Sequence, residues 1–475
     1  MASEQTLLQP EERVLSTLEA DGSRRWLYPR LSAGRYWQAR RLVAYALIAI
    51  FTLIPYITIN GKPAMLLDIL HRRFTLFGYT FLPTDTALLA VFMLMVLLSI
   101  FAITAVLGRV WCGWACPQTV YMEYLFRPIE RLVMGRAGTG GKPQNVAGWR
   151  MLLTFALSIV ACLYLAHTFL AYFVGVAQLR VWVTQSPFDH PAAFVVMAVV
   201  TGLMVFDFLY FREQTCIIAC PYGRLQSVLL DKSSLIVSYD TGRGEPRGKL
   251  RKSLPIAEKQ GDCIDCDMCV QVCPTGIDIR GGLQVECIGC TQCIDACDAV
   301  MDKIGRPRGL VRYTSQAALA GEKTRIIRPR VAIYAVLVLG LLTFLTILLA
   351  TKSPADVTLL RQTGSPFLIR PTGQVENIIV VKIANRLDEP QEYAISLLNQ
   401  PKLSVETTDR VVRLAPGQLF QEPVHVLAPR DVFDDGEYPI TVRVTTPDGH
   451  VVDRPFRMLG PLGVPVAPAA GKGQP

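Results

Sequence analysis

Five long apolar segments constrain the fold of this chain more than any other feature. Each approaches or reaches the length of about 20 mainly apolar residues that a helix needs to cross the hydrocarbon core of a bilayer. The last segment carries no charge and no clear polar face, which a helix on a soluble domain would normally show. The sequence therefore predicts five transmembrane helices, over residues 42–59, 87–108, 151–173, 192–211 and 331–350.

The composition agrees with a membrane protein. Hydrophobic residues make up 51% of the 475 residues and charged residues only 18%, whereas charged residues reach roughly 25% in ordinary soluble domains. The net charge of +9 would suggest a nucleic-acid partner if the basic residues formed one soluble patch. They are scattered between the apolar segments instead, so we predict that the chain binds no nucleic acid.

The distribution of Lys and Arg predicts the orientation of the helices. The N-terminal segment and the four loops that follow it carry, in chain order, 7, 3, 6, 1 and 18 of these residues. Basic residues accumulate in cytoplasmic loops, whereas a long domain crosses the membrane largely regardless of its charge. The N-terminal segment, the loop 109–150 and the segment 212–330 are therefore predicted to be cytoplasmic. The C-terminal domain is predicted to lie outside the cytoplasm.

The region after the last apolar segment follows another pattern. Stretches of alternating apolar and polar residues, such as 377–385 and 438–446, are separated by turn signals that include Thr446-Pro-Asp-Gly449. This pattern predicts a β-sandwich of about 100 residues. No catalytic constellation stands out within it, so we interpret it as a binding or docking module. The residues from 461 onward are rich in Pro, Gly and Ala and are predicted to be disordered.

The cysteines indicate metal chemistry more than disulfides. Twelve of the 13 fall into four regularly spaced groups, and only Cys162 stands alone in an apolar run. None follows Cys297, and no cleavable signal sequence is evident near Met1.

Two of the groups have the spacing C-x2-C-x2-C-x3-C, followed by Pro274 in the first and by Asp298 in the second. Three cysteines at this spacing wrap around a cubane cluster, and in two-cluster ferredoxins the fourth ligand comes from the partner motif. We assign one [4Fe-4S] cluster to Cys263, Cys266, Cys269 and Cys297. The second is assigned to Cys287, Cys290, Cys293 and Cys273. Zinc sites typically pair well-separated C-x2-C units and fit this spacing poorly.

The other two groups are C-x3-C-P, formed by Cys112, Cys116 and Pro117 and by Cys216, Cys220 and Pro221. Each lies just beyond the predicted cytoplasmic end of an apolar segment, so the first two segments and the next two resemble a repeat. We expect the four thiols to converge. Thiolates favour soft ions such as Cu(I) and iron–sulfur clusters, while inert thiols in two structural turns are the alternative.

On these motifs the chain resembles the membrane polyferredoxins of the CcoG/FixG/RdxA type, which are accessory proteins for assembling cbb-type cytochrome oxidases. The resemblance spans the WCGWACPQ and TCIIACPYG motifs, the eight-cysteine insert, the fifth apolar segment and the C-terminal domain, which it implies is immunoglobulin-like. It also implies a cupric reductase of the bacterial inner membrane, with copper as substrate and Cys112, Cys116, Cys216 and Cys220 as the reducing site.

The implied partners are a cytoplasmic electron donor, a copper chaperone or transporter, and cbb-type oxidase subunits. The acidic stretch from Asp262 to Asp302 could select a basic donor. The oligomeric state is left open, with a dimer as one option. Two other functions remain open: a quinone-linked electron conduit to a partner redox protein, in which the four cysteines hold a further cluster or are structural, and a non-redox assembly scaffold.

The predicted architecture is a multi-domain membrane protein with a five-helix transmembrane region, an α+β ferredoxin insert with two clusters and a C-terminal immunoglobulin-like β-sandwich. Its predicted parts are a cytoplasmic segment (1–41), four helices with the C-x3-C-P motifs (42–211, the second motif at 216–221), a cytoplasmic segment (212–330) with the ferredoxin domain at about 255–305, a fifth helix (331–350), a periplasmic domain (351–460) and a disordered tail (461–475).

Overall fold

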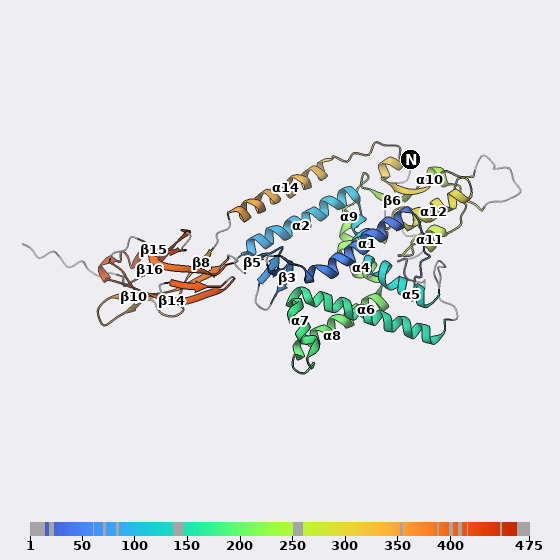
Figure 1. Cartoon of the computed structure of the whole chain (residues 1–475). Helices are drawn as coiled ribbons and strands as arrows, with labels where there is room; N and C mark the ends of the chain where they lie inside the picture. The colour runs from blue at the N-terminus through green and yellow to red at the C-terminus, as the bar shows by residue number, and fades with distance from the viewer. Residues whose placement is uncertain are drawn as a thin grey trace, which may run out of the picture. The chain divides into compact units, whose positions relative to one another are not determined.

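The structure is a computed structural model (Figure 1) that describes residues 15–18, 23–59, 61–69, 73–81, 85–135, 146–249, 260–351, 355–386, 389–398, 402–406, 411–415, 417–446 and 449–462. The predicted disordered tail lies outside these residues from 463 onward. The chain divides into two compact units, one formed by Met1–Ile69 and Ala90–Leu345 and the other by Leu70–Leu89 and Thr346–Pro475.

Five helices are long and apolar enough to cross a membrane, which confirms the predicted transmembrane region. They are α1 (Arg35–Leu53), continued by the 3-10 turn η1 (Ile54–Tyr56), α2 (Thr86–Leu107), α6 (Gly148–Val174), α8 (Pro191–Val205), continued by the π-helix η4 (Phe206–Phe211), and α14 (Pro329–Ala350). The first helix begins at Arg35, before the apolar run that starts at residue 42. The carboxylate of Asp295, a residue more than 250 positions away in the sequence, accepts hydrogen bonds from the backbone N–H groups of the first turn of this helix.

Short helices follow the second and fourth spans. After the second span come α3 (Val110–Trp114), α4 (Pro117–Tyr121), the π-helix η3 (Met122–Phe126) and α5 (Arg127–Val133). After the fourth span come the π-helix η5 (Thr215–Ala219) and α9 (Pro221–Leu229). Pro117 and Pro221 each occupy the first position of a helix, where the missing N–H costs no hydrogen bond. The sequence Cys-Pro therefore starts a new helix in both motifs, with Cys116 and Cys220 as extended residues before it.

Small strands and one short helix make up the other connections between the first four spans. They are β1 (Thr58–Ile59), β2 (Lys62–Pro63), β3 (Met65–Asp68), β4 (Arg73–Leu76), β5 (Tyr79–Phe81) and α7 (Val176–Thr184). Strands β1 and β2 pair antiparallel, as do β4 and β5.

The insert between the fourth and fifth spans is closed by a pair of strands. Strand β6 (Ile236–Tyr239) pairs antiparallel with β7 (Val311–Thr314), and between them lie α10 (Thr241–Gly244), α11 (Met268–Gln271), η6 (Ile279–Gly281) and α12 (Gln292–Lys303). Helix α13 (Gln316–Leu319) follows β7. Helices α11 and α12 lie at the end of the membrane helices where α1 begins (Figure 1). Val237, Ile277, Ile294 and Met301 form part of a small core around the cysteines.

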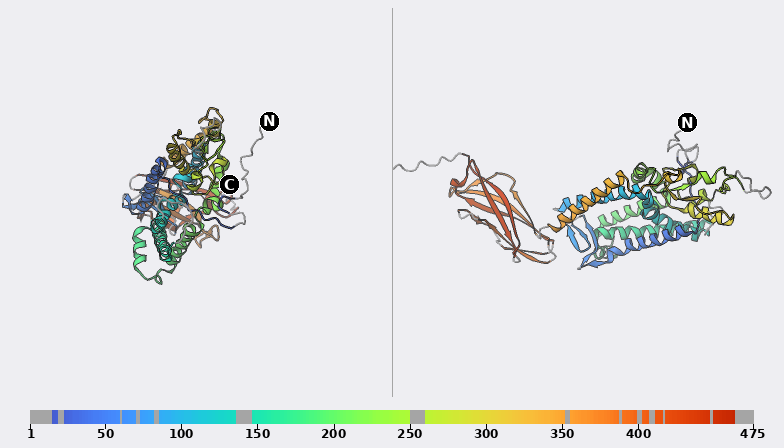
Figure 2. Two further views of the ribbon diagram at one scale, coloured as in Figure 1. Left: turned by 90° about the vertical axis from the view of Figure 1, so that its right-hand side faces the viewer. Right: turned by 90° about the horizontal axis from the view of Figure 1, so that it is seen from above.

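The C-terminal region is the predicted β-sandwich (Figure 2). One sheet has the order β12-β14-β10-β8, with β9 paired to β10, and the other has the order β13-β11-β15-β16. Apolar side chains of β10 and β15 form the core with Tyr393 and Met458. The elements are β8 (Ala355–Arg361), β9 (Leu368–Ile369), β10 (Val375–Asn385), β11 (Gln391–Leu397), β12 (Ser404–Glu406), β13 (Val411–Leu414), β14 (Leu419–Ala428), η7 (Arg430–Val432), β15 (Glu437–Thr445) and β16 (Val451–Leu459).

Candidate metal centres

The two ferredoxin loops share one backbone conformation. Asp265 and Gly289, two residues after the first cysteine of each motif, have φ values of +54° and +66°. Asp267 and Thr291, directly after the second cysteine, have φ values of +55° and +65°. This left-handed region is tolerated by Gly and Asp but is rare for a β-branched residue. The identical cysteine spacing therefore corresponds to two loops that fold alike, at some conformational cost at Thr291.

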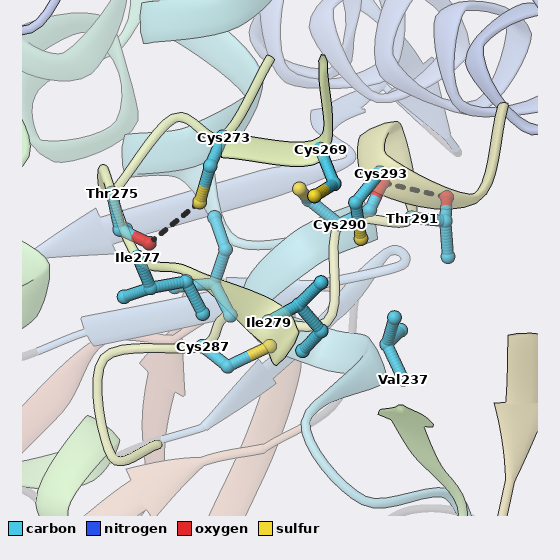
Figure 3. A pocket seen from close by; sticks show the side chains of 11 residues that line it. Val237, Cys269, Cys273, Thr275, Ile277, Ile279, Cys287, Cys290, Thr291 and Cys293 are labelled. Carbon is cyan, nitrogen blue, oxygen red and sulfur yellow. Dashed lines mark hydrogen bonds between the residues drawn. The ribbon is translucent and has the colours of Figure 1, made fainter. Parts of the chain in front are cut away.

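The loops surround two cavities lined by sulfur and apolar side chains. Cys263, Cys266, Cys269 and Cys297 line the first together with Leu310, Val300 and Met301. Cys273, Cys287, Cys290 and Cys293 line the second, to which Cys269 also contributes (Figure 3). Each set contains the four cysteines that the sequence assigns to one cluster, although the ligand assignment itself stays a prediction.

The chemistry of the thiols fits a positively charged iron core. Burial raises the pKa of Cys269 and Cys297 to about 12 and that of Cys290 to about 11, and it also raises the pKa of Cys273 and Cys287. Such thiols become thiolates at neutral pH when a metal compensates their charge. Among the described residues no three ligand-type side chains converge on one point, as a single ion would require. Sulfurs spread around a cavity suit a multi-iron cluster better.

Arg280 organises the loop of the first motif. Its side chain is largely buried and forms ion pairs of 2.7 Å with Asp265, Asp267 and Asp278. Two of these carboxylates belong to the left-handed residues of the loop. The single basic residue in this acidic stretch is therefore an internal partner of the loop and is not part of a basic surface.

The C-x3-C-P cysteines lie among short helices, and Cys112 takes part in a buried hydrogen-bond network. Its Sγ donates to Oε1 of Gln226 at 2.8 Å. The amide nitrogen of Gln226 donates in turn to the hydroxyl of Tyr222 at 2.8 Å and to that of Thr104 at 3.0 Å. Gln226 is fully buried, so its amide holds the Cys112 thiol in one orientation.

The structure brings the four C-x3-C-P thiols together. Cys216 interacts electrostatically with the other three, and Cys112 does so with Cys116 and Cys220. Burial raises the pKa of Cys112 to about 11 and that of Cys216 to about 12, while the Arg109 guanidinium lowers both. The four thiols are neighbours, but in the described part of the chain no three of them are arranged as ligands of one ion.

The set of four C-x3-C-P cysteines contacts the second ferredoxin motif through Cys112, which the sequence did not reveal. Cys112, Ile288 and Cys290 form one buried cluster, against which Cys216 packs. Gly113 permits the contact, because a Cβ there would lie 2.7 Å from the carbonyl oxygen of Ile288 and 2.9 Å from Cα of Cys290. Residue spacing carries no signal for a contact between segments so distant in sequence.

Sequence reasoning also missed Arg40, which it counted as one of the cytoplasmic basic residues. The structure buries its side chain completely, and Nε donates to the carbonyl oxygen of Gly113 at 2.9 Å. No local sequence signal separates Arg40 from its exposed neighbour Arg41.

Family models match three parts of the chain. A model described as "4Fe-4S dicluster domain" matches residues 211–316, and one described as "IG-like fold at C-terminal of FixG" matches residues 345–461. A third, described as "4Fe-4S binding domain", matches residues 89–134, which include Cys112 and Cys116. The chain thus carries iron–sulfur domains and an immunoglobulin-like C-terminal domain.

Relatives match most of the chain. Protein RdxB of Cereibacter sphaeroides is 33% identical over 85% of this chain and 88% of its own length. Nitrogen fixation protein FixG of Rhizobium meliloti is 29% identical over 93% of this chain and 94% of its own. A solved structure of a FixG-related protein from Vibrio parahaemolyticus is 21% identical, covers 23% of this chain and all of its own, and has a TM-score of 0.22. The chain belongs to the FixG and RdxA family of membrane iron–sulfur proteins.

Proposed function

We propose that this protein reduces Cu(II) to Cu(I) for assembly of the haem–copper centre of a cbb-type cytochrome c oxidase. Each copper ion gains one electron, which a donor protein supplies through the two [4Fe-4S] clusters. The proposed site of reduction is the thiol group of Cys112, Cys116, Cys216 and Cys220.

The observation that carries the proposal is the packing of Cys112 and Cys216 against Cys290. Cys290 lines the second cluster cavity, so an electron on that cluster would be next to the thiol group. The first cavity includes Cys266, which is exposed. Entry of electrons at the first cluster and exit from the second is the order that this arrangement favours.

Thiolates suit the product of the reaction. Soft sulfur ligands bind Cu(I) more strongly than Cu(II), which increases the driving force for reduction. Because the Cys112 thiol donates a hydrogen bond to Oε1 of Gln226, binding of copper by Cys112 requires loss of the thiol proton and of that hydrogen bond.

The proposal includes an orientation and partners. The positive-inside pattern favours a cytoplasmic ferredoxin domain and a periplasmic β-sandwich in the bacterial inner membrane. The donor is then cytoplasmic, and the copper source is a chaperone or transporter. The β-sandwich is proposed to dock subunits of the oxidase.

Anaerobic Cu(II) reduction by the purified, cluster-loaded protein tests the copper chemistry. A chemical reductant supplies electrons, a Cu(I)-specific chelator reports the product, and reductant without protein gives the background. We expect a variant with Cys112, Cys116, Cys216 and Cys220 changed to Ser to fall to background at unchanged ferredoxin iron content. Cys162→Ser, at a buried cysteine within a membrane helix, is the matched control. Background rates for wild type with cycling clusters would refute the copper proposal.

A second candidate is an electron conduit to quinone or a partner redox protein, in which the four thiols hold a third cluster. The match of residues 89–134 to a 4Fe-4S binding domain favours it. Iron analysis separates the two candidates, because two [4Fe-4S] clusters contain about eight iron atoms and three contain about twelve. Loss of about four iron atoms in the four-Ser variant would support the conduit.

A further inference from the structure

Arg40 is a buried cation with unused hydrogen-bonding capacity. Its side chain is 1% exposed, and Nε donates to the carbonyl oxygen of Gly113 at 2.9 Å. Both terminal guanidinium nitrogens are buried, and within the described part of the chain neither has a hydrogen-bond partner. Burying an unpaired charge is costly. A side chain in this state indicates that an anionic group lies close to it in the working protein.

The protein carboxylate near Arg40 does not fill this role. Glu123 lies within electrostatic reach of Arg40, but it already forms an ion pair with Arg127 one helical turn away. The ring of Tyr124 lies 5.7 Å from the Arg40 guanidinium carbon and offers only a weak cation–π contact. Among the described residues Arg40 therefore has no ion pair of its own, and Glu123, which is paired with Arg127, offsets its charge only in part.

The second cluster cavity is the anionic site that adjoins Arg40. Gly113 connects the two, because its carbonyl oxygen accepts a hydrogen bond from Arg40, and a Cβ at Gly113 would lie only 2.9 Å from Cα of Cys290. Arg40 also interacts electrostatically with the Cys290 sulfur. A [4Fe-4S] cluster bound by four thiolates carries a net negative charge that grows by one on reduction. A fixed buried cation next to Cys290 stabilises the reduced form more than the oxidised form, because the local dielectric constant is low.

The first cluster cavity has a different electrostatic environment. Its arginine, Arg280, is neutralised by three carboxylates, those of Asp265, Asp267 and Asp278. The side chains around the first cavity therefore add negative charge. At the second cavity Arg40 acts on Cys290 and Arg109 on Cys287 as positive charges, which Glu123 and Glu286 offset in part. Net charge near a cluster is one of the factors that set its reduction potential.

We propose that Arg40 raises the reduction potential of the cluster assigned to Cys273, Cys287, Cys290 and Cys293 above that of the other cluster, so that an electron collects next to Cys112 and Cys216. Arg40 is in this sense a positioning residue that acts through the cluster. The inference rests on the cluster assignment and on no step of the copper chemistry.

A redox titration of the full-length, cluster-loaded protein followed by electron paramagnetic resonance tests the proposal. Dithionite is the reductant, and Cys266→Ser, at a residue assigned to the first cluster, identifies that cluster's signal. We expect Arg40→Gln to shift the reduction equilibrium of the second cluster at least tenfold toward its oxidised form, which is about 59 mV for a one-electron couple. Arg40→Lys keeps the positive charge but loses the Nε hydrogen bond to Gly113. Its second cluster should have a reduction potential between those of wild type and Arg40→Gln.

Arg41→Gln is the matched control, because Arg41 is the next residue of the same helix and is exposed. Arg41→Gln should change the reduction equilibrium constant of each cluster by less than a factor of two relative to wild type. Equal potentials in wild type and Arg40→Gln, at full iron content, would overturn the inference, as would a shift confined to the first cluster. A protein that shows the expected shift but reduces no copper would refute the proposed function and leave the role of Arg40 intact.

Discussion

The carboxylate of Asp295 accepts the backbone N–H of Trp37 at 2.7 Å. It also accepts the N–H of Tyr36 at 3.2 Å. Asp295 belongs to α12, between two cysteines of the second motif, whereas Trp37 is in the first turn of α1, a membrane helix. The free N–H groups of a first turn are usually satisfied by a residue close in sequence. Here the ferredoxin domain supplies the acceptor, so the start of α1 depends on the folded cluster domain.

Asp295→Ala should destabilise the protein by about 1 kcal/mol, the usual cost of losing an acceptor at a helix N-terminus. Asp295→Asn retains one acceptor oxygen and should cost less. Hydrogen exchange of residues 35–41 measures the effect locally, and thermal unfolding measures it globally. Asp302→Asn is the control, because Asp302 lies on the same helix and forms an exposed ion pair with Arg308, which is worth little. Equal exchange in Asp295→Ala and wild type would contradict the capping role.

Gly113→Ala should separate the thiol group from the second ferredoxin motif. The new Cβ would lie within 3.0 Å of backbone atoms of Ile288, Gly289 and Cys290, which cannot move as freely as a side chain. Overpacking of this kind typically costs about 1–3 kcal/mol. We expect reduced iron content in the second cluster. Gly202→Ala in α8, where a Cβ meets nothing within 4 Å, should retain full iron, and the two variants should differ clearly in iron per chain.

Gln226→Leu should expose the role of the buried amide. The substitution leaves the Cys112 thiol without its acceptor and removes the donor to Tyr222 and Thr104, for an expected loss of about 2 kcal/mol in unfolding free energy. Cys112 should also react faster with a maleimide, because the hydrogen bond to Gln226 stabilises the protonated thiol, whereas the thiolate is the nucleophile. Arg224→Gln, at an exposed residue of the same helix, is the control. An unchanged labelling rate at Cys112 would show that the amide does not restrain it.

The β-sandwich should lose stability in acid through Glu376. Hydrogen bonds from Arg370, together with the contact to His425, lower the pKa of Glu376 from 4.5 to about 2. A carboxyl group with a lowered folded-state pKa stabilises the fold above its unfolded pKa, and this contribution disappears as the pH falls from about 4.5 toward 2.

Glu376→Gln removes that dependence. Wild type should be more stable than the variant by about 1 kcal/mol at pH 6, because the partners are partly exposed and solvent weakens the pair. The difference should shrink as the pH approaches 2. Hydrogen exchange of β10 peptides at each pH, compared between the two proteins, gives the measurement. A difference that stays constant from pH 6 to pH 2.5 would exclude the carboxylate as its source.

Local patterns in the sequence predicted the elements but not their contacts. Runs of apolar residues predicted the five membrane helices, and alternation predicted the β-sandwich, because both patterns report which side of an element is buried. The start of α1 was not predictable, since Asp295 lies more than 250 residues away from Trp37. Arg40 illustrates the same limit: a basic residue at a membrane edge is counted as a topological signal, and only the tertiary structure shows that it is buried.

In the candidate sites, too, the sequence indicated the cysteines but not the residues that pack around them. Cysteine spacing indicates which residues bind iron, because a tight loop must present several sulfurs to one cluster. It says nothing of the neighbours Gln226 and Gly113, whose roles arise from packing between the segment 104–121 and the segment 216–290. Sequence reasoning expected the four C-x3-C-P thiols to converge, but it did not foresee that Cys112 would share a buried cluster with Cys290.

The pairing of β6 with β7 has a consequence for how such a protein could arise. Strand β6 follows the fourth membrane span and helix α9, β7 precedes the fifth span, and their antiparallel pairing brings the two ends of the cluster domain together. Domains whose ends are adjacent are tolerated as insertions in a host chain. A shorter ancestor could therefore have acquired this domain in a single genetic event, without a change in the number or direction of its membrane crossings.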